Sequence, residues 1–437
     1  MCGQIIFGGI PAKGKLPVSI DEVFISGSGI IQNKSIRFKF TTPEDVGAKP
    51  EYIVRADSIA MEGIRDGAYP GCQVLAAKNG KVFYYKSFGS HTYDGKQPVL
   101  NTDLYDLASV TKIAATTLSL MKLTDEKKFS LDDKLGKYLK EELDSSPYST
   151  TVIRKMLAHQ AGFVDWIPFF MKVVKKGKYD KKVFRTQPEI GFRTQVAENL
   201  YILDTYEDSI IKTIKKTRLT GVYKYKYSDL GFYLLKRVVY KKTGKPLSQY
   251  AKESFYDKLG LRTAGYNPRD RFPLSRITPT EKDTTFRYQL VHGFVHDQGA
   301  AMVGGVGGHA GLFADMLDVA IIFQMLMNYG EYGGERYIQK STIKEWTACQ
   351  FCPKNRRGAA FDRPTGNGKG PTSTQVSMES FGHTGFTGIT AWADPKTGIV
   401  YIFLSNRSYP IAENNKIITT GIRTRIQAAF YHAFGYF

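Results

Sequence analysis

The sequence predicts a mixed α/β fold, in which an antiparallel sheet is flanked by helices and joined to a mostly helical subdomain over about residues 125–300. Three observations predict it: strand-like apolar runs early in the chain, similar runs near its end, and helical spacing of apolar residues between them. With 437 residues, 42% of them hydrophobic, the chain can bury a large core. This length favours two structural units, or one enzyme with an inserted subdomain.

The beginning of the chain differs from the rest. Glycines punctuate short apolar pieces there, and residues 41–50 have the composition of a linker. We therefore expect residues 1–49 to be the tail of a preceding domain with a linker. Residues 50–437 are expected to form the main domain.

Each element of the main domain has its own signal. Residues 55–66 show helical spacing, and the strand-like runs 72–78 and 81–88 meet at Asn79-Gly80, a dipeptide typical of hairpin turns. Further helices are predicted over residues 110–123, 153–159, 230–243, 247–259 and 415–434, and further strands over residues 388–393 and 399–405. The helix that begins near Ser109 and the late strand pair are expected to flank one cleft.

Charge and hydropathy exclude some function classes. The 61 Lys and Arg residues outnumber the 41 Asp and Glu residues, which gives a net charge of +20 and would suit an anionic partner. The densest basic stretches, residues 172–182 and 212–226, show no nucleic-acid motif, so we expect a small-molecule or peptide substrate and no nucleic acid. Neither a signal peptide nor a run of eighteen apolar residues occurs, so no membrane span is expected and the localisation stays open.

The four cysteines do not form the dense pattern of a disulfide scaffold. Only Cys349 and Cys352 lie close together in the sequence, and this pair supplies too few ligands for a zinc site. We expect incidental thiols or one local disulfide. No metal and no other cofactor is predicted.

Ser109 and Lys112 have the spacing of an activated nucleophile. Residues three apart share one face of a helix, so the lysine amine would lie beside the serine hydroxyl and help to activate it for acyl transfer. The same spacing follows Ser119, Ser209 and Ser341, so the spacing alone does not select a serine. Only Ser109 stands at a predicted strand-to-helix turn, where the alternative is an ordinary N-cap serine.

Two later triplets strengthen the choice of Ser109. Tyr227-Ser228-Asp229 places a phenol and a carboxylate in a loop that enters a predicted helix, and His383-Thr384-Gly385 precedes a predicted strand. A glycine there lets the backbone pass close to a ligand. Each triplet also has a plain alternative, because Tyr206-Glu207-Asp208 fits the first pattern and a His-Thr-Gly triplet is often only a loop.

Together these patterns resemble the serine β-lactamases, D-Ala-D-Ala carboxypeptidases and related esterases, especially their class C-like branch. The Ser-x-x-Lys, Tyr-x-Asn and Lys-Thr-Gly elements of that family occur here in the same order, as residues 109–112, 227–229 and 383–385. Residues 157–162 (LAHQAG) and 304–313 (GGVGGHAGLF) also look like the family. The resemblance covers residues 52–437 and implies a β-lactamase/transpeptidase-like fold and a serine hydrolase activity.

The resemblance implies a role for each candidate residue. Ser109 would form an acyl-enzyme with an ester or amide, while Lys112 and Tyr227 share its proton. The backbone N–H groups of Ser109 and Phe386 would form the oxyanion hole. The substrate would be bound by Asp229, His383, Thr384 and Gly385.

The family also assigns the histidines of the middle segment to a glycine-rich stretch that borders the site. These residues are His292, His296 and His309, with Asp297 among them. We therefore do not expect them to bind a metal.

Two positions depart from the family pattern. Asp229 stands where Asn is usual and His383 where β-lactamases have Lys, so we expect an extra carboxylate and no permanent cation in the pocket. This disfavours β-lactams, and small activated esters are expected to react better than penicillins. An esterase or peptidase acting on peptidoglycan-derived peptides is favoured over a true β-lactamase and over a non-catalytic cell-wall binding module.

Residues 7–19 resemble the closing segment of the second domain of family 3 glycoside hydrolases. This resemblance implies a longer fusion, with a glycosidase in front of the serine hydrolase and peptidoglycan fragments as their common substrate. Export, and with it a periplasmic or secreted location, would then be encoded upstream.

Overall fold

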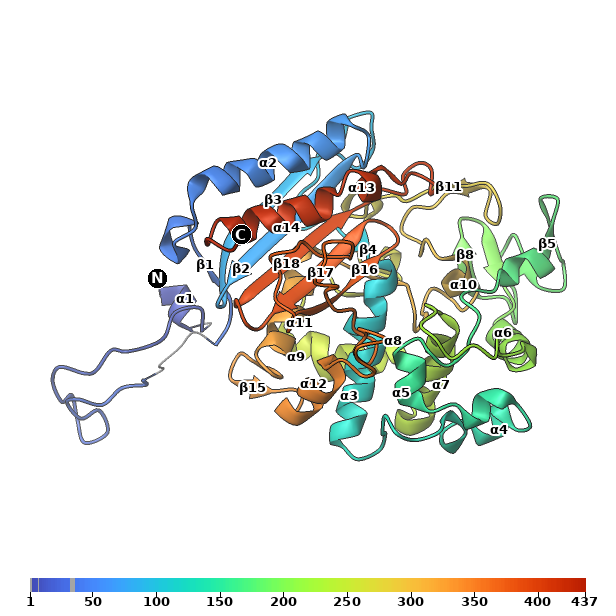
Figure 1. The fold of residues 1–437 in the computed structure, drawn as a ribbon, viewed down its shortest axis with the longest axis horizontal. Coiled ribbons are helices and arrows are strands. Elements are labelled where there is room, and N and C mark those ends of the chain that lie inside the picture. Colours follow the sequence, from blue (N-terminus) through green and yellow to red (C-terminus); the bar gives the residue numbers. More distant parts are fainter. Residues whose placement is uncertain (1, 7, 32–35) are drawn as a thin grey trace.

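The structure, a computed structural model, describes residues 2–6, 8–31 and 36–437. Its centre is a six-stranded sheet with the strand order β1-β3-β2-β18-β17-β16 (Figure 1). All neighbouring strands are antiparallel except β1 and β3, which confirms the predicted antiparallel sheet. The strands are β1 (Lys39–Phe40), β2 (Gly71–Lys78), β3 (Lys81–Gly89), β16 (Phe381–Gly385), β17 (Ile389–Asp394) and β18 (Ile399–Ser405).

Helices cover both faces of the sheet. α2 (Pro50–Arg65) and α14 (Ile422–His432) lie side by side on one face, and α11 (Met316–Met327) packs on the other (Figure 1). In β18, Tyr401 and Phe403 join the core under α2 and α14, whereas the alternate residues face α11. Because both faces are covered, every residue of β18 is buried, and the strand has a continuous apolar sequence.

Both predicted hairpins are present. β2 and β3 meet at Asn79 and Gly80, which have positive φ angles of 50° and 78°, and β17 pairs with β18. The predicted final helix is wrong in one respect, because it is divided into α13 (Lys416–Thr419) and α14. Gly421, with φ 63°, adopts a left-handed conformation between the two and so interrupts the helical hydrogen bonding.

The segment that lies across the cleft contains helices and also short strands that the sequence pattern did not indicate. Residues 247–259 are not one regular helix, because a wider helical turn at Lys252–Tyr256 separates α8 from α9. The helices are α4 (Lys140–Leu143), α5 (Ile153–Leu157), α6 (Tyr206–Lys216), α7 (Leu230–Thr243), α8 (Leu247–Ala251), α9 (Asp257–Leu259) and α10 (Gln298–Ala301). The strands are β5 (Val174–Lys175), β6 (Lys178–Tyr179), β7 (Phe184–Arg185), β8 (Thr194–Ala197), β9 (Leu200–Ile202), β10 (Gly265–Tyr266), β11 (Lys282–Asp283) and β12 (Gln289–Leu290).

A three-stranded sheet in the order β10-β13-β4 connects this segment to the start of the helix that carries Ser109. Phe313 of β13 pairs with Asp106 of β4, only three residues before Ser109 in the chain. The remaining elements are α1 (Cys2–Ile6), α3 (Leu118–Asp125), α12 (Lys340–Thr347), β4 (Tyr105–Asp106), β13 (Leu312–Ala314), β14 (Glu331–Tyr332) and β15 (Glu335–Arg336).

The chain joins the sheet before the predicted start of the main domain. β1 pairs with the edge of β3, and the neighbouring Phe38 is part of the large core. Of the segment 7–19 that resembles the end of a glycosidase domain, Phe7 lies outside the described residues, and residues 8–19 form turns and irregular chain. Among the helices that the structure describes, none is long and apolar enough to cross a membrane.

Candidate active site

A cavity of about 720 Å³ lies between the β16 edge of the sheet and the helical segment. Ser109, Tyr227, Asp229, His383 and Phe386 all line it, together with Thr384. Residues from three distant parts of the sequence therefore meet at one cavity, as the sequence analysis expected.

Ser109 stands in a short turn between β4 and the following helix. Ala108 has a positive φ of 45°, which is uncommon for a residue with a Cβ, and its N–H donates to Asp106 Oδ1 at 2.8 Å. After Ser109 the chain forms a widened helical turn over Lys112–Thr117 and then continues as α3. The strand-to-helix turn thus exposes the Ser109 hydroxyl to the cavity, while Lys112 is directed beneath it.

Lys112 is fully buried, and its amine makes three polar contacts. Nζ lies 2.8 Å from Ser109 Oγ, 2.7 Å from Asp229 Oδ1 and 3.1 Å from the carbonyl oxygen of His309. Burial by itself lowers the pKa of Lys112, but the adjacent Asp229 carboxylate and Tyr227 outweigh it, so the pKa is raised. Lys112 therefore stays protonated in the resting site.

The Tyr227 hydroxyl donates to Ser109 Oγ at 3.0 Å. Its ring lies against the ring of His159, with centroids 4.4 Å apart, and the Arg357 guanidinium carbon lies 5.4 Å from its centroid. Burial raises the pKa of Tyr227, and the Lys112 ammonium opposes that rise only in part. Tyr227 is therefore a neutral phenol beside the serine.

Asp229 was expected to face the substrate, but its carboxylate has a partner within the protein. Its carboxylate is paired with the buried Lys112 amine, although the residue also borders the cavity. An Asn at this position could not form this ion pair, so the departure from the family pattern contributes, together with Tyr227, to the raised pKa of Lys112.

His383, Thr384 and Gly385 lie within β16 itself, and not in a loop before the next strand. β16 pairs in antiparallel register with β17, with His383 opposite Ala391 and Gly385 opposite Ile389. A Cβ added at Gly385 would lie 2.6 Å from the carbonyl oxygen of Leu107. Glycine is therefore required for β16 to approach the turn that holds Ser109.

The expectation that the pocket lacks a permanent cation is wrong, because Arg357 lines the cavity beside His383. Arg357 Nη1 lies 3.4 Å from His383 Nε2, and Nη2 lies 2.9 Å from the Tyr225 hydroxyl and 3.2 Å from Asp362 Oδ2. Sequence reasoning missed Arg357 because it lies in an irregular loop, 26 residues before His383, with no motif around it.

His383 is neutral, as expected. Burial, together with the nearby Arg357 and Lys112 cations, lowers the pKa of His383 well below its usual range. Its Nδ1 lies 2.6 Å from the carbonyl oxygen of Thr384, which can only accept, so Nδ1 carries the proton and Nε2 faces Arg357 as an acceptor. His383 therefore accepts a hydrogen bond from Arg357 and places no second positive charge beside the guanidinium.

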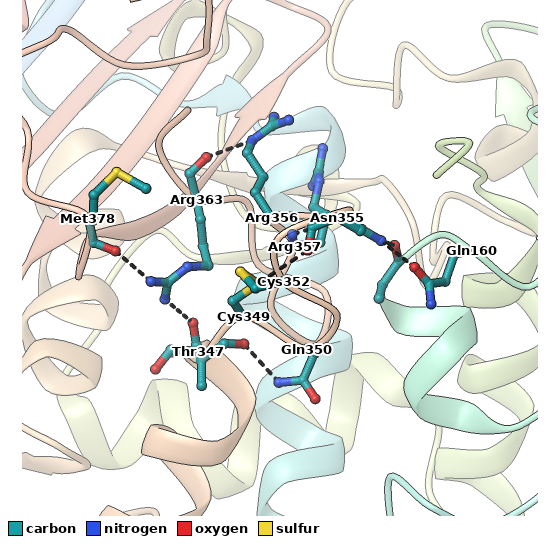
Figure 2. The surroundings of a disulfide bond; sticks show 12 residues. Gln160, Thr347, Cys349, Gln350, Cys352, Asn355, Arg356, Arg357, Arg363 and Met378 are labelled. Atoms are coloured by element: carbon teal, nitrogen blue, oxygen red, sulfur yellow. Dashed lines mark hydrogen bonds between the residues drawn. A yellow bond between two sulfur atoms is a disulfide. The ribbon is translucent and has the colours of Figure 1, made fainter. Parts of the chain in front are cut away.

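A disulfide lies at the base of the loop that carries Arg357 (Figure 2). It joins Cys349 and Cys352, one of the two states left open by the sequence. Asn355 ties the same loop to the neighbouring helix, since its Nδ2 donates to the Ala158 carbonyl at 2.8 Å and to Gln160 Oε1 at 2.9 Å (Figure 2). Asn355 Oδ1 accepts from the Arg357 N–H at 3.1 Å, so the loop fixes the backbone of Arg357.

The opposite wall of the cavity includes His296, Asp297 and His309. Asp297 Oδ1 lies 2.8 Å from His309 Nε2, and although burial raises the pKa of Asp297, His309 outweighs it and holds the pKa well below its usual range. His292 lies apart, with its ring nitrogen 2.7 Å from the Ile277 carbonyl. The described part of the chain contains no group of three or more side chains placed to hold a metal ion.

The other serines with the same spacing lie elsewhere. Ser119 is buried and donates to the Ala115 carbonyl at 2.8 Å, whereas Ser209 and Ser341 are exposed and outside the cavity. Tyr206 begins α6 and does not line the cavity either. Among these four serines, Ser109 alone lines the cavity and has a lysine amine and a tyrosine hydroxyl beside its own hydroxyl.

Comparison with known proteins places this arrangement in a family. The family model described as Beta-lactamase matches residues 56–420. A protein of Escherichia coli O157:H7 named "Putative D-alanyl-D-alanine carboxypeptidase" is 32% identical over 408 residues, covering 86% of this chain and 87% of that protein. A Salmonella agona protein of the same name is 30% identical, with the same shares covered.

Solved structures share the fold. EstCE1, a hydrolase with promiscuous acyltransferase activity, aligns with a TM-score of 0.63 at 18% identity, covering 89% of this chain and 100% of that one. A penicillin-binding protein homologue from Caulobacter crescentus aligns with a TM-score of 0.62 at 18% identity, covering 88% and 98% of the two chains. At this identity the two likenesses establish the fold alone.

Proposed function

The chain belongs to the β-lactamase family of serine hydrolases, and from this premise we propose that it cleaves an ester or amide through an acyl-enzyme on Ser109. The substrate class that fits best is a peptide with a free terminal carboxylate, such as a peptidoglycan-derived peptide ending in D-Ala-D-Ala. The serine hydrolase activity itself follows from family membership.

One observation carries the proposal. Ser109 Oγ lies at the cavity surface within hydrogen-bond distance of both the Lys112 amine, at 2.8 Å, and the Tyr227 hydroxyl, at 3.0 Å. A serine hydroxyl needs a neighbour that accepts its proton before it can attack a carbonyl. At rest both neighbours donate hydrogen bonds to Ser109 Oγ, so they position the hydroxyl, and a further group must take up its proton.

The proton of Ser109 needs an acceptor, and a protonated Lys112 is not one by itself. We propose that Lys112 passes one of its protons to Asp229, 2.7 Å away, as it takes the proton of Ser109. The O–H bond of Ser109 breaks, an O–H bond forms on Asp229, and Lys112 remains an ammonium throughout. Ser109 Oγ is then free to bond to the substrate carbonyl carbon.

The negative charge that develops on the carbonyl oxygen would be held by the backbone N–H groups of Ser109 and Phe386. When the bond to the leaving group breaks, Tyr227 gives its proton to that group and regains one from Asp229 through Lys112. Water then deacylates Ser109 by the reverse route. All three side chains return to their starting charge, so the cycle balances.

Arg357 supports a carboxylate on the leaving part of the substrate. Its guanidinium borders the cavity next to His383 and Thr384, and a planar guanidinium binds a carboxylate through paired, charge-assisted hydrogen bonds. The same feature makes a true β-lactamase the second candidate, because Arg357 removes the reason for which β-lactams were disfavoured.

Intact-protein mass spectrometry tests the nucleophile. After incubation with a fluorophosphonate, the wild-type chain should gain one phosphonate, and a Ser109→Ala variant that keeps its melting temperature should gain none. Labelling that persists in the variant, or that maps to Ser119, Ser209 or Ser341, contradicts the assignment. If the folded wild-type chain takes up no label, the alternative of a non-catalytic cell-wall binding module is supported instead.

Substrate competition tests the reaction class. The wild type should release D-Ala from diacetyl-lysyl-D-Ala-D-Ala, and a penicillin should form a long-lived adduct on Ser109 that blocks this release. If the penicillin adduct turns over faster than the peptide is cleaved, the second candidate replaces the first.

A further inference from the structure

The wall of the cavity that faces away from Arg357 is acidic, although the chain as a whole carries a net charge of +20. Most of this wall is formed by residues 281–285 and 296–298, with residues 410–413 beside them. Glu281, Asp283 and Asp297 contribute buried or half-buried carboxylates, and Lys282 contributes the only ammonium among these lining residues. The local charge is thus the reverse of the overall charge.

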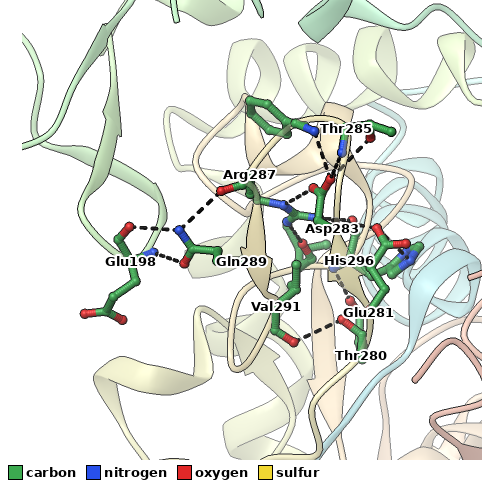
Figure 3. Close-up of polar contacts among 12 residues, drawn as sticks. Glu198, Thr280, Glu281, Asp283, Thr285, Arg287, Gln289, Val291 and His296 are labelled. Carbon is green, nitrogen blue, oxygen red and sulfur yellow. Dashed lines mark hydrogen bonds and ion pairs between the residues drawn. The ribbon is translucent and has the colours of Figure 1, made fainter. Parts of the chain in front are cut away.

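Two of these three carboxylates are occupied within the protein. Asp283 pairs with Arg287 Nε at 2.8 Å and accepts from the backbone N–H groups of Thr285 and Phe286 (Figure 3). Asp297 accepts from the Ala300 N–H at 2.7 Å and lies 2.8 Å from His309 Nε2. Both therefore have structural roles in shaping the wall.

Glu281 is different. It is 9% exposed, it lines the cavity, and its Oε1 has no hydrogen-bond partner among the described residues. The nearest cationic or basic atoms are His296 Nε2 at 3.4 Å and Arg287 Nη2 at 3.9 Å (Figure 3). Arg287 is already bound to Asp283 and to the carbonyl oxygens of Val295 and His296, so it does not neutralise Glu281 fully.

Burying a carboxylate oxygen without a hydrogen bond is costly, and such groups are uncommon in folded proteins. His296 Nε2, which lies beside Glu281 and also lines the cavity, has no hydrogen-bond partner among the described residues either. The two atoms lie 3.4 Å from each other without the geometry of a hydrogen bond, so neither fully satisfies the other, and a polar group of the substrate would supply the missing partner of Glu281. A carboxylate accepts hydrogen bonds only, so that group is a donor.

The direction of β16 places Glu281 relative to the reacting bond. Arg357 adjoins His383 near the middle of β16, whereas Phe386 follows its end. The ring of His296 stacks on Phe386, with centroids 5.2 Å apart, and Glu281 lies next to His296. Arg357 and Glu281 therefore adjoin different stretches of this edge, Arg357 at His383 and Glu281, through His296, at Phe386.

We infer that Glu281 is a specificity-determining residue, and that the acyl part of the substrate carries an ammonium group which Glu281 binds. This inference rests on the proposed function, in which Arg357 holds the carboxylate of the leaving part. The substrate is then dipolar: its leaving part is anionic and its acyl part is cationic. A free amine on a peptide side chain or at a peptide amino terminus has this chemistry.

A matched pair of esters tests the inference without requiring peptide cleavage. The p-nitrophenyl esters of Nα-acetyl-lysine and of Nα,Nε-diacetyl-lysine differ only in the side-chain charge, and both the D and the L forms are compared. In the wild type the free amine should raise kcat/KM about tenfold, the size typical of one hydrogen bond to a charged group. The ratio should fall at high ionic strength.

Glu281→Gln should bring the ratio between the two esters close to one. The ratio is measured within one protein, so it does not depend on the fraction that is folded. Glu198→Gln is the matched control, because the backbone of Glu198 contacts the same loop at Gln289 (Figure 3), whereas its carboxylate pairs with Arg269 and does not line the cavity. It should keep the wild-type ratio.

Equal rates for the two esters in the wild type, or a wild-type ratio in Glu281→Gln, would overturn the inference and leave the proposed function standing. If neither ester acylates Ser109, the proposed function fails and this inference fails with it. A tenfold ratio that disappears only in Glu281→Gln supports both.

Discussion

At the scale of single residues, the contact between Asp229 and Lys112 has the largest chemical consequence. A buried lysine without a counter-ion tends to lose its proton and can then serve directly as a base. Here the carboxylate 2.7 Å away keeps the pKa of Lys112 above its usual value. In the mechanism that we propose, the basic group of the site is therefore the Asp229 carboxylate, which acts through Lys112.

Asp229→Asn tests this assignment through the pH dependence of acylation. In the variant Lys112 itself must be neutral to accept a proton, so the acidic limb of the pH–rate profile should move to higher pH. The rate at neutral pH should drop, because part of the Lys112 population is still an ammonium there, and it should recover at alkaline pH, where the unpaired Lys112 is neutral and serves as the base itself.

Glu413→Gln is a suitable control for this experiment, because Glu413 is an exposed carboxylate on the rim of the same cavity. Its pH–rate profile should keep the wild-type acidic limb. Stopped-flow measurement of p-nitrophenol release gives the acylation rate directly. An Asp229→Asn profile that coincides with the wild type would exclude the relay through Asp229.

At the scale of elements, the loop after α12 brings a cation to the site. The Cys349–Cys352 disulfide closes the beginning of this loop, and Asn355 ties the loop to Ala158 and Gln160, just after α5. Without them the backbone of Arg357 would have more freedom, and part of the binding energy for a carboxylate would be spent on ordering it. If Arg357 binds the substrate as proposed, this loop couples the disulfide to substrate recognition.

Two variants separate the contribution of the Arg357 charge from that of the disulfide. Arg357→Met should lower kcat/KM for a carboxylate-terminated peptide about 10- to 100-fold relative to p-nitrophenyl acetate, which has no carboxylate. The Cys349→Ser/Cys352→Ser double variant should shift the same ratio in the same direction, but only by a few-fold. Parallel kinetics on the two substrates measure the ratio, and an Arg357→Met ratio equal to that of the wild type would remove the carboxylate from the proposed substrate.

At the scale of the whole molecule, the N-terminal region contributes one strand to the central sheet. β1 covers the edge of β3, and Phe38 is buried in the large core. Residues 18–31 lie outside the core and expose several large apolar side chains. The two parts of this region therefore differ in what they contribute to stability.

Two deletions should show the difference by thermal unfolding. Removing residues 2–31 should change Tm little, because few core contacts are lost. Removing residues 2–42 should lower Tm by several degrees, since it exposes the edge of β3 and the core around Phe38, whose burial contributes about 2 kcal/mol. Equal Tm values for the two deletions would show that β1 does not stabilise the sheet.

The sequence by itself determined the features that depend on local spacing. Lys112 lies three residues after Ser109, which suffices to place the two on one helix face, and the hairpin at Asn79-Gly80 follows from its turn residues. Continuous apolar runs indicated the buried central strands. These predictions succeeded because neighbours along the chain dominate each of them.

Contacts between distant segments required the tertiary structure. Arg357 and Glu281 lie in irregular segments whose paths are determined by packing against other elements, so no periodicity or motif marks them. Asp229 was recognised as unusual, but its partner became clear only when α7 and the turn at Ser109 were brought together. The sequence determined which residues are candidates for the reaction, and the tertiary structure decided which charges surround them, because electrostatic neighbours depend on distance in space and not on separation along the chain.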